Sequence, residues 1–391
     1  MTENIKTYLV GGAVRDHLLG VKIKDRDFVV VGGTAEAMLN NGFEQVGMGF
    51  PVFLHPVTKE EYALARVDTK VGAGYTGFTF DTRPSVTLEE DLSRRDLTIN
   101  SMALDENDQL VDPFGGLDDL KNRVLKHTSD AFTEDPLRVV RLARFHARYL
   151  KLGFQVHADT ITLCEQMVYR GDLNHLPAER FWLELMKAFN DADPAPFFQF
   201  LYKIGALKKV TFFQKLFPDL YRHDPDVSSP IHTLTHLAKH LYELYPPETA
   251  VQVFAAISCG TWNGDGIYPD RQSQMMNAAL KSLRAYQYDE DKLYDKFEEN
   301  GIDDMQELGA LLEKCLSNMR AWSSSNKLVD DVGICLSVMK HFGVDPIDPV
   351  RFAKAIVAGR RVTSEPYQHL DGKAIGAAMT AARVKLIAGV I

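Results

Sequence analysis

The stretch YLVGGAVRDHLLGVKIKDRDFVVVG, from Tyr8 to Gly32, decides the fold class of the first part of the chain. It encloses a glycine pair and the helix-compatible segment AVRDHLLG between two apolar runs that are typical of strands. A strand, a turn at Gly11 and Gly12, and a helix that ends at Gly20 are the start of an α/β or α+β module. Acidic residues stand before the second strand, where a buried sheet has no structural need for them.

Asp25 and Asp27 are the sharpest signal in this stretch, because they are two residues apart at the beginning of the second strand. Residues i and i+2 of a strand point to the same side, so the two carboxylates should lie close together. Like charges in that position repel each other unless a cation lies between them, and Mg²⁺ prefers oxygen ligands. The pair predicts a magnesium site; the alternative is a DxD loop that only caps the following element.

The glycine turn is a candidate anion site. Free backbone N–H groups at a helix N-terminus attract phosphate, and Arg15 in the first turn can add a charge-assisted hydrogen bond. The spacing is neither GxGxxG nor a Walker loop, so it predicts neither a dinucleotide fold nor a P-loop. Taken alone, a glycine pair is equally compatible with a simple turn.

The periodicity of the sequence changes near residue 130. Before it, β-like runs (TYLVGG, DFVVVG, EYALARV, QLVDPF) alternate with helical segments such as TAEAMLNNG, which Thr34 caps and Gly42 ends. After it, helical patterns cover DPLRVVRLARFHARYLKLG, ADTITLCEQMVYRG, AERFWLELMKAFN and PAPFFQFLYKIGALKKV. Further helices are expected over 230–390, interrupted at Pro246-Pro247 and at WNGDGIYPD (262–270). We therefore expect an α+β fold: a head over 1–131 with a mixed sheet, a helical neck over 132–210, and a helical body and tail over 211–391.

Composition places the chain among ordinary globular proteins. Its 391 residues suggest two to four modules, and 45% are hydrophobic and 25% charged. No apolar run is long enough to cross a bilayer, and MTENIKTYLVGG does not read as a secretory signal. The four cysteines form no CxxC pair, so we expect free thiols in a reducing compartment, no thiolate zinc site and a cytoplasmic location. They are Cys164, Cys259, Cys315 and Cys335.

A basic stripe interrupts an otherwise acidic chain of net charge −9. No Asp or Glu occurs over 137–158, where basic residues recur every three or four positions, and such a stripe can bind RNA. The alternative is a solvated helix face. The basic residues are Arg138, Arg141, Arg144, Arg148 and Lys151.

Three further segments carry polar residues in suggestive patterns. In EDPLRVVRLARF (134–145), Pro136 fits the first turn of a helix, which puts Asp135, Arg138, Arg141 and Arg144 in one row. An aspartate acceptor beside arginine donors can address the Watson–Crick edge of C or A; the alternative is an intrahelical ion pair. In LSRRDLTINSMALD (92–105), Arg94, Arg95 and Asp96 precede a helix-compatible pattern, and Arg95 could reach a triphosphate. DPFGGLDDL (112–120) predicts a turn followed by a helix start.

Four segments occur in the order LVGGAVRDHLLG…KDRDF, RRDLTINSMA, DPFGGLDDL and EDPLRVVRLARF. Together they resemble the successive motifs of class II tRNA nucleotidyltransferases and bacterial poly(A) polymerases. Both belong to the polymerase β-like nucleotidyltransferase superfamily. FPVFLHPVTKEEYALAR and GYTGFTF are most similar to the bacterial CCA-adding enzymes of the gammaproteobacterial type. The resemblance is dense over 5–150, moderate over 150–210 and thin beyond 230.

The resemblance implies a Mg²⁺-dependent enzyme that adds or repairs the 3′-terminal CCA of tRNA from CTP and ATP without a nucleic-acid template. It implies that Asp25 and Asp27 are catalytic and bind the metal. It assigns the triphosphate to Gly12 and Arg15 and further nucleotide contacts to Arg95. Asp135 and Arg138 match the pair that reads the base, and Arg141 and Arg144 match further nucleotide-contacting arginines. The segment 72–80 resembles the loop linked to the switch from C to A addition.

The chain also departs from that pattern. Long gammaproteobacterial members carry an HD phosphohydrolase domain, but here VFAAISCGTWNGDG has Cys259-Gly260 where the His-Asp pair is expected. His232 and His236 are four residues apart and could be metal ligands on one helix face, yet without the His-Asp pair a structural or relic role is favoured. We expect no phosphohydrolase activity from this degenerate region.

Other activities stay open at this point. The motifs do not separate CCA addition from A-only or CC-only addition or from poly(A) synthesis. A non-catalytic RNA-binding relative is a different class of function, and the presence of Asp25, Asp27 and Arg95 counts against it. The expected partners are the tRNA 3′ end, CTP and ATP, with no membrane; monomer and dimer are both compatible with the sequence.

Overall fold

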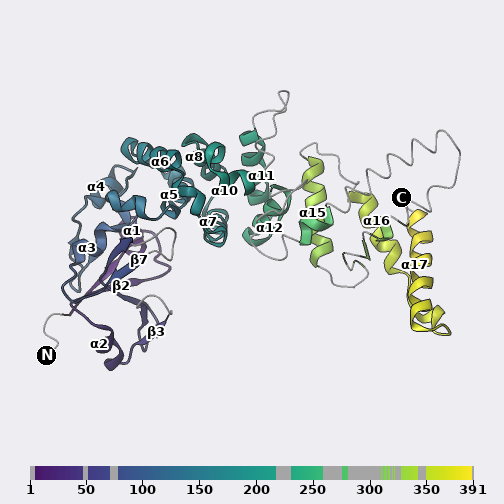
Figure 1. Cartoon of the computed structure of the whole chain (residues 1–391), viewed down its shortest axis with the longest axis horizontal. Helices are drawn as coiled ribbons and strands as arrows, with labels where there is room; N and C mark the ends of the chain where they lie inside the picture. The colour runs from purple at the N-terminus through teal and green to yellow at the C-terminus, as the bar shows by residue number, and fades with distance from the viewer. Residues whose placement is uncertain are drawn as a thin grey trace. The chain divides into compact units, whose positions relative to one another are not determined.

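A computed structural model describes residues 5–46, 52–70, 78–216, 230–258, 275–280, 327–341 and 349–389, with a few residues between 310 and 321. The chain consists of two compact units, Met1–Phe212 and Phe213–Ile391. Figure 1 labels their helices and strands.

Seven of the described strands form one mixed sheet in the first unit (Figure 1). Their order is β3-β4-β5-β2-β1-β8-β9. Strands β2 and β5 run parallel, with Phe28 opposite Tyr62, and the other neighbours are antiparallel. The strands are β1 (Lys6–Val10), β2 (Asp27–Val31), β3 (Glu44–Val46), β4 (Val52–Leu54), β5 (Glu61–Leu64), β8 (Ala103–Leu104) and β9 (Leu110–Val111).

Two short strand pairs accompany the main sheet. Strands β6 (Val67–Lys70) and β7 (Phe78–Asp81) form an antiparallel pair. Strands β10 (Val124–Leu125) and β11 (Gln155–Val156) are parallel. Most of the predicted 72–80 loop lies outside the described residues.

The glycine and cap residues in the sequence predicted the first two helices correctly. Helix α1 (Gly12–Leu18) follows the glycine turn and stops just before Gly20. Helix α2 (Ala35–Asn40) is capped by Thr34, whose Oγ1 accepts a hydrogen bond from the N–H of Ala37 at 3.1 Å. The predicted stop at Gly42 is confirmed, since this glycine has a φ of +82°.

The helix-compatible pattern after Asp96 does not form an α-helix. Helix α3 (Leu88–Ser93) ends before it, and the chain then makes one 3₁₀ turn over Thr98–Asn100. Strand β8 follows and pairs with β1, with Ala103 opposite Val10. The residues of this segment are buried, and β8 gains backbone hydrogen bonds by pairing with β1. This tertiary pairing overrides the helical periodicity of the sequence. The predicted helix start at 112–120 is confirmed as α4 (Gly116–Lys121).

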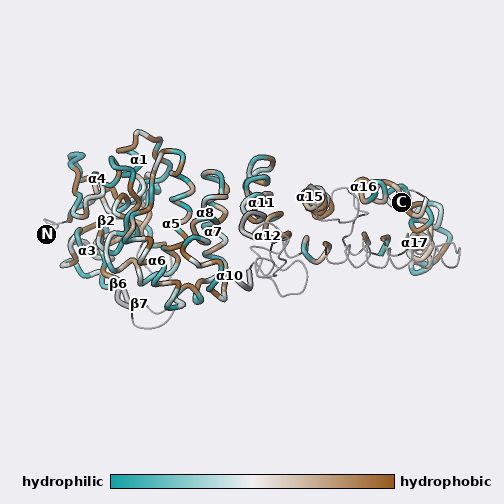
Figure 2. The backbone as a smooth tube through the Cα atoms, turned by 90° about the horizontal axis from the view of Figure 1, so that it is seen from above, coloured by the Kyte–Doolittle hydropathy of each residue, from teal (hydrophilic) through white to brown (hydrophobic). Residues whose placement is uncertain are grey.

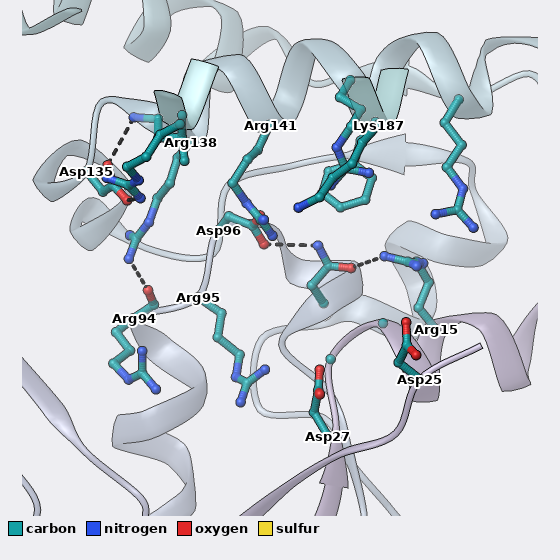
Figure 3. A pocket seen from close by; sticks show the side chains of 18 of the residues that line it. Arg15, Asp25, Asp27, Arg94, Arg95, Asp96, Asp135, Arg138, Arg141 and Lys187 are labelled. Carbon is teal, nitrogen blue, oxygen red and sulfur yellow. Dashed lines mark hydrogen bonds and ion pairs between the residues drawn. The ribbon is translucent and has the colours of Figure 1, made fainter. Parts of the chain in front are cut away.

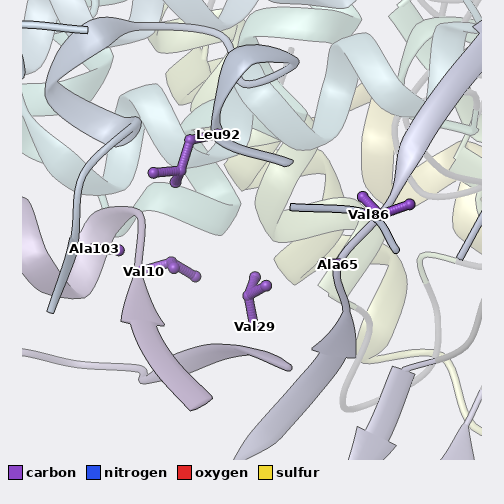
Figure 4. Packing of buried hydrophobic residues seen from close by; sticks show 6 residues of the cluster. All are labelled: Val10, Val29, Ala65, Val86, Leu92 and Ala103. Carbon is purple, nitrogen blue, oxygen red and sulfur yellow. The ribbon is translucent and has the colours of Figure 1, made fainter. Parts of the chain in front are cut away.

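Hydrophobic side chains cover both faces of the sheet. One cluster contains Val29 and is drawn in Figure 4; the other contains Val30. Successive strand residues point to opposite faces, so Asp27 shares the face of Val29. The first cluster consists of Val10, Val29, Ala65, Val86, Leu92 and Ala103, and the second of Val30, Met38, Phe53 and Leu64.

The remainder of the first unit is helical, as predicted. Helix α5 packs against α7 and α8, and the aromatic side chains of Phe181, Phe189, Phe197 and Phe198 are fully buried. Figure 2 shows hydrophobic and hydrophilic residues mixed along these helices, as one-sided burial requires. The helices are α5 (Leu137–Tyr149), α6 (Ala158–Arg170), α7 (Ala178–Asp191), α8 (Ala195–Lys203), α9 (Ala206–Lys209) and α10 (Thr211–Leu216), which crosses into the second unit.

The second unit contains the predicted helices. Helix α12 begins at Pro247, where the proline pair predicted an interruption. His236 of α11 is exposed. The side chain of His232 lies outside the described residues, as do Cys259, Gly260, Cys315 and 262–270. The described helices are α11 (Pro230–Leu244), α12 (Pro247–Ser258), α15 (Lys327–His341), α16 (Pro349–Arg360) and α17 (Gly372–Ala388). Over the described part of the chain, no helix combines the length and apolarity needed to span a membrane.

Candidate active site

A pocket of about 590 Å³ lies in the first unit (Figure 3). Its walls come from α1, the entrance of β2, the segment after α3, and helices α5 and α7. As far as the described residues go, ten basic side chains and four aspartates line it, so the pocket favours a polyanion. All nine predicted site residues line this one pocket: Gly12, Arg15, Asp25, Asp27, Arg95, Asp135, Arg138, Arg141 and Arg144.

Asp25 and Asp27 of the opening stretch face the pocket together. Strand β2 begins at Asp27, so the expectation that Asp25 also belongs to the strand is wrong; it lies in the segment before it. Figure 3 shows both carboxylates pointing into the pocket, with Arg95 on the side of Asp27 and Arg15 on the side of Asp25. Loss of water around Asp27 raises the pKa of its carboxyl group; Arg95 opposes this rise and Asp25 adds to it.

This carboxylate pair fits a magnesium ion. Among the residues that the structure describes, no group of three or more His, Cys, Asp or Glu side chains is placed to hold a metal. Mg²⁺ commonly takes only one or two protein carboxylates and completes its shell with water and substrate phosphates. A pair of oxygen ligands at an open, basic pocket is therefore suited to a metal that arrives with a polyphosphate. Burial raises the pKa of Asp27, and a cation would relieve the repulsion from Asp25 that adds to this rise.

The glycine turn brings the backbone close to an arginine. Gly11 has φ +71° and ψ −131°, a conformation that only glycine adopts without strain. A Cβ atom there would lie 3.0 Å from Nη1 of Arg95. Gly12, the predicted residue, is also close to an arginine, because a Cβ atom there would lie 3.3 Å from Nη2 of Arg15. Gly11, which was not among the predicted site residues, is the more constrained of the two.

Arg15 is buried and held from several sides. Its Nε donates to Oδ1 of Asp16 at 2.8 Å, and its Nη1 donates to Oδ1 of Asn100 at 2.6 Å. Its guanidinium lies 5.3 Å from the ring centre of Phe145 and 5.5 Å from that of Tyr149. The side chain is therefore fixed before any ligand binds.

Asp91 orients two arginines at the other wall of the pocket. Its buried carboxylate bonds to Nη2 of Arg94 at 2.7 Å and to Nη2 of Arg95 at 3.1 Å. Burial alone would raise the pKa of Asp91, but the two guanidinium groups outweigh it and hold the pKa below its usual value. Arg95 thus faces the pocket as a preorganised cation.

Asp135 is placed differently from the prediction. It is an extended residue before Pro136, and α5 begins only at Leu137, because a residue before proline avoids the helical conformation. Its carboxylate accepts from the N–H of Leu137 at 3.1 Å and from Nη2 of Arg180 at 2.8 Å. Arg138 bonds instead to the carbonyls of Ala131 and Arg94. An intrahelical Asp135–Arg138 pair is therefore not formed.

The arginines further along α5 are paired rather than solvated. Nε of Arg141 donates to Oδ2 of Asp96 at 2.8 Å, and Nε of Arg144 donates to Oε2 of Glu184 at 2.6 Å. Arg148 also lines the pocket, whereas Lys151 does not. Arg141 outweighs the effect of burial on Asp96 and holds the pKa of this carboxyl group far below its usual value. The alternative of a solvated helix face is wrong for the four arginines of this stripe, whereas Lys151 is exposed.

Several pocket residues were not among the predicted site residues. Arg180 and Lys187 are seven residues apart on α7, a spacing that puts them on one helix face and could have signalled a shared role. Asn100 carries no sequence signal, because a single amide has no characteristic spacing. The remaining lining residues missed are Gly11, Arg66, Arg94, Asp96, Leu137, Phe145 and Arg148.

Residues 7–126 match the family described as the poly(A) polymerase head domain. Relatives named multifunctional CCA protein extend the likeness beyond the head. The one from Haemophilus influenzae (strain PittGG) is 51% identical over 262 residues, which are 65% of this chain and 62% of the relative. The one from Actinobacillus pleuropneumoniae serotype 5b (strain L20) is 55% identical over 234 residues, 59% and 57% of the two chains.

The chain therefore spans about three fifths of the length of these curated relatives. A solved structure of a CCA-adding enzyme in its apo form II has the same fold, with a TM-score of 0.63 and 20% identity over 99% of this chain and 88% of the other. The head-domain match and the two relatives confirm the resemblance to poly(A) polymerases and CCA-adding proteins, and the solved structure shows a shared fold. The head domain contributes the carboxylate pair, Gly12, Arg15 and Arg95 to the pocket, while α5 and α7 close it.

Proposed function

We propose that this protein is a tRNA nucleotidyltransferase that adds or repairs the 3′-terminal CCA from CTP and ATP. The 3′ hydroxyl of the tRNA attacks the α-phosphate, a phosphodiester bond forms, and pyrophosphate leaves. The observation that carries the proposal is a single basic pocket that joins the Asp25–Asp27 pair of the head domain to the arginine row of α5. The family likeness and the names of the relatives support the same reaction.

Arginines of the pocket bind the triphosphate in this proposal. Arg15 and Arg95 flank the carboxylate pair in Figure 3, and both are held in place by acidic partners. Fixed cations stabilise the charge that develops on a leaving pyrophosphate without reorganisation during the reaction. Because Gly12 has no side chain, the phosphates can approach the backbone and Arg15 at this end of the pocket.

The opposite end of the pocket reads the base. Asp135 offers carboxylate acceptors for the exocyclic amine of C or A, and arginines of α5 offer donors for the ring acceptors. Arg180 already holds the Asp135 carboxylate in one orientation. Arg138 is fixed to two backbone carbonyls, so both members of the base-reading pair are oriented in advance. Arg141 and Arg144 extend the row toward the sugar and phosphates.

Asp25 and Asp27 would hold Mg²⁺, which favours ionisation of the attacking hydroxyl and offsets charge on the phosphates. The chain's own contribution is to keep two carboxylates together at the edge of a basic pocket. Burial raises the pKa of Asp27 above its usual value. A cation beside the carboxylate would stabilise its charged form and so favour loss of the proton.

The proposal extends to the whole molecule. The head over 1–131 carries the chemistry, the neck over 132–210 reads the base, and the helices of 211–391 bind the tRNA body. The buried free thiols of Cys164 and Cys335 suit a reducing compartment, which supports a cytoplasmic location. We propose no phosphohydrolase activity for the second unit; metal-dependent phosphodiester hydrolysis that His232→Ala abolishes would contradict this.

The deciding experiment supplies labelled CTP or ATP with Mg²⁺ to tRNA that lacks CCA and to tRNA that ends in CC. We expect both nucleotides to be incorporated and synthesis to stop at CCA. Asp25→Ala should abolish incorporation, whereas Asp118→Ala, an exposed aspartate of α4 outside the pocket, should not.

The same experiment separates the alternatives. Long A tails would identify a poly(A) polymerase, which the head-domain family also admits. Incorporation of only A or only C would identify a partial CCA enzyme. No incorporation into any primer would overturn the catalytic proposal and leave a protein that only binds RNA.

A further inference from the structure

Asn100 occupies an unusual place between two charged residues of the pocket. Its Oδ1 accepts from Nη1 of Arg15 at 2.6 Å, and its Nδ2 donates to Oδ1 of Asp96 at 2.9 Å. The dashed lines that lead from Asp96 to Arg15 in Figure 3 mark these two hydrogen bonds. Only 6% of the residue is exposed, and this buried amide satisfies its oxygen and one of its N–H groups with these charged partners.

The connection continues into the neck. Oδ2 of Asp96 accepts from Nε of Arg141 at 2.8 Å. Arg15 belongs to α1 of the head and Arg141 to α5. Two intervening side chains, Asn100 and Asp96, therefore connect the arginine beside the carboxylate pair with the arginine row that faces the base.

A second route joins the same two elements. Arg15 pairs with Asp16, whose other oxygen lies 3.6 Å from Nη2 of Arg148 on α5. Arg148 and Arg144 both face Asp191 of α7. Along α7, Glu184 contacts Arg144 at 2.6 Å and Arg141 at 3.6 Å, which closes the ring.

Within this ring of described side chains, arginines alternate with carboxylates except at Asn100. The amide has a physical advantage at that position. A second carboxylate on Arg15 would neutralise the charge that is needed for phosphate, and it would repel Asp96. An apolar residue would leave Nη1 of Arg15 and Oδ1 of Asp96 without this bond.

We propose that Asn100 is a positioning residue that couples base recognition to triphosphate binding. It links the position of Arg15, which is already held before a ligand binds, to the positions of Asp96 and Arg141, so a base that engages the arginine row also affects the orientation of the cation that binds the phosphates. This inference rests on the proposed function and identifies how the two ends of the nucleotide site act together.

The test compares Asn100→Leu and Asn100→Asp with Asn41→Leu, a matched change at an exposed amide of the head. We expect kcat/KM for CTP and for ATP to fall by about 10²-fold in both Asn100 variants, as for a misplaced binding group. Asn41→Leu should stay within about twofold of the parent chain, in keeping with its exposed position. Thermal unfolding measured alongside separates this loss from simple misfolding.

Two further comparisons distinguish coupling from a merely structural role. In Asn100→Asp combined with Asp96→Asn, the carboxylate and amide exchange places, and part of the lost activity should return. In the chain with Asn100, the losses from Arg15→Lys and Arg141→Lys should be non-additive by about threefold or more, because one hydrogen-bond network joins them. In the Asn100→Leu background the same two losses should multiply.

Distinct results would overturn the inference. Activity of Asn100→Leu equal to that of Asn41→Leu, or losses from Arg15→Lys and Arg141→Lys that multiply while Asn100 is present, would show that no coupling runs through the amide. In either case CTP and ATP incorporation by the parent chain would leave the proposed function standing. A parent chain that incorporates no nucleotide would overturn both proposals.

Discussion

At the scale of single residues, the pocket is built from charges that are held in place before a ligand arrives. Arg15, Arg95 and Arg141 each have a carboxylate partner within 3.1 Å. Such pairs cost free energy through desolvation, so in a pocket they are better explained by function than by stability. Asp25 and Asp27 differ from these arginines, because each carboxylate has a like charge beside it, which Arg95 offsets only in part at Asp27.

Asp27→Asn should raise the stability of the metal-free protein while it abolishes nucleotide incorporation. The folded-state pKa of Asp27 is raised, so the folded state loses stability as the pH rises through that pKa. An amide removes this cost at neutral pH and also removes the metal ligand. Urea unfolding at pH 7 without divalent ions checks the first effect, and an unfolding midpoint below that of the parent chain would contradict it.

Asp96 should make the protein sensitive to acid. Its pKa is lowered in the folded state, so its stabilising contribution is complete above the ordinary aspartate pKa of about 4 and is lost as the pH falls below it. We expect Asp96→Asn to be less stable at pH 7 and to show a shallower decline between pH 5 and 2. Denaturant midpoints across this range measure both. Equal slopes in the two proteins would refute the assignment.

Gly11→Ala should damage both folding and activity. The methyl group would force a glycine-only conformation and press on Nη1 of Arg95, at a cost of at least about 1–2 kcal/mol. Gly20→Ala is the matched control, since Gly20 also has a positive φ but no atom within 4 Å of the added carbon. We expect that control to lose stability and keep its nucleotide incorporation. Full incorporation by Gly11→Ala would show that the close approach is not needed.

At the scale of elements, α7 joins a buried aromatic face to the pocket. Phe181 is fully buried and packs on Phe197 and Phe212, whereas Leu183 is 61% exposed. The same helix presents Arg180 and Lys187 to the pocket. Its packing therefore fixes the position of two residues that line the pocket.

Phe181→Ala should destabilise the first unit by about 3–5 kcal/mol, the usual cost of a large cavity in an aromatic core. Leu183→Ala in the same helix should change stability by less than about 0.5 kcal/mol, because its side chain is mostly in solvent. Equilibrium unfolding of the two variants provides the comparison. Similar losses in both would mean that α7 is not packed as described.

At the scale of the whole molecule, the complete pocket lies in the first compact unit. A chain that ends at Leu216, after α10, should therefore still bind CTP. We expect it to lose affinity for tRNA, because the proposed function places the tRNA body on the helices of the second unit. Equilibrium binding of CTP and of tRNA to the shortened chain measures the two effects. Unchanged tRNA affinity would refute the role proposed for the second unit.

The sequence by itself determined the features that depend on near neighbours in the chain. The strand–turn–helix at Gly11–Gly20, the cap at Thr34 and the row of arginines on α5 follow from local conformational preferences and helical spacing. The order of the motifs also predicted nine site residues, and all nine line one pocket.

Only the tertiary structure decided which side chains form hydrogen bonds and ion pairs with one another inside that pocket. Asp135 bonds to Arg180, which lies 45 residues away, rather than to Arg138. The segment after Asp96 becomes a turn and a strand because β1 offers it a pairing edge. Asn100 gains its place between Arg15 and Asp96 only when the turn over Thr98–Asn100 packs against α1 within the head. These outcomes depend on burial and on partners distant in sequence, which local preference does not encode.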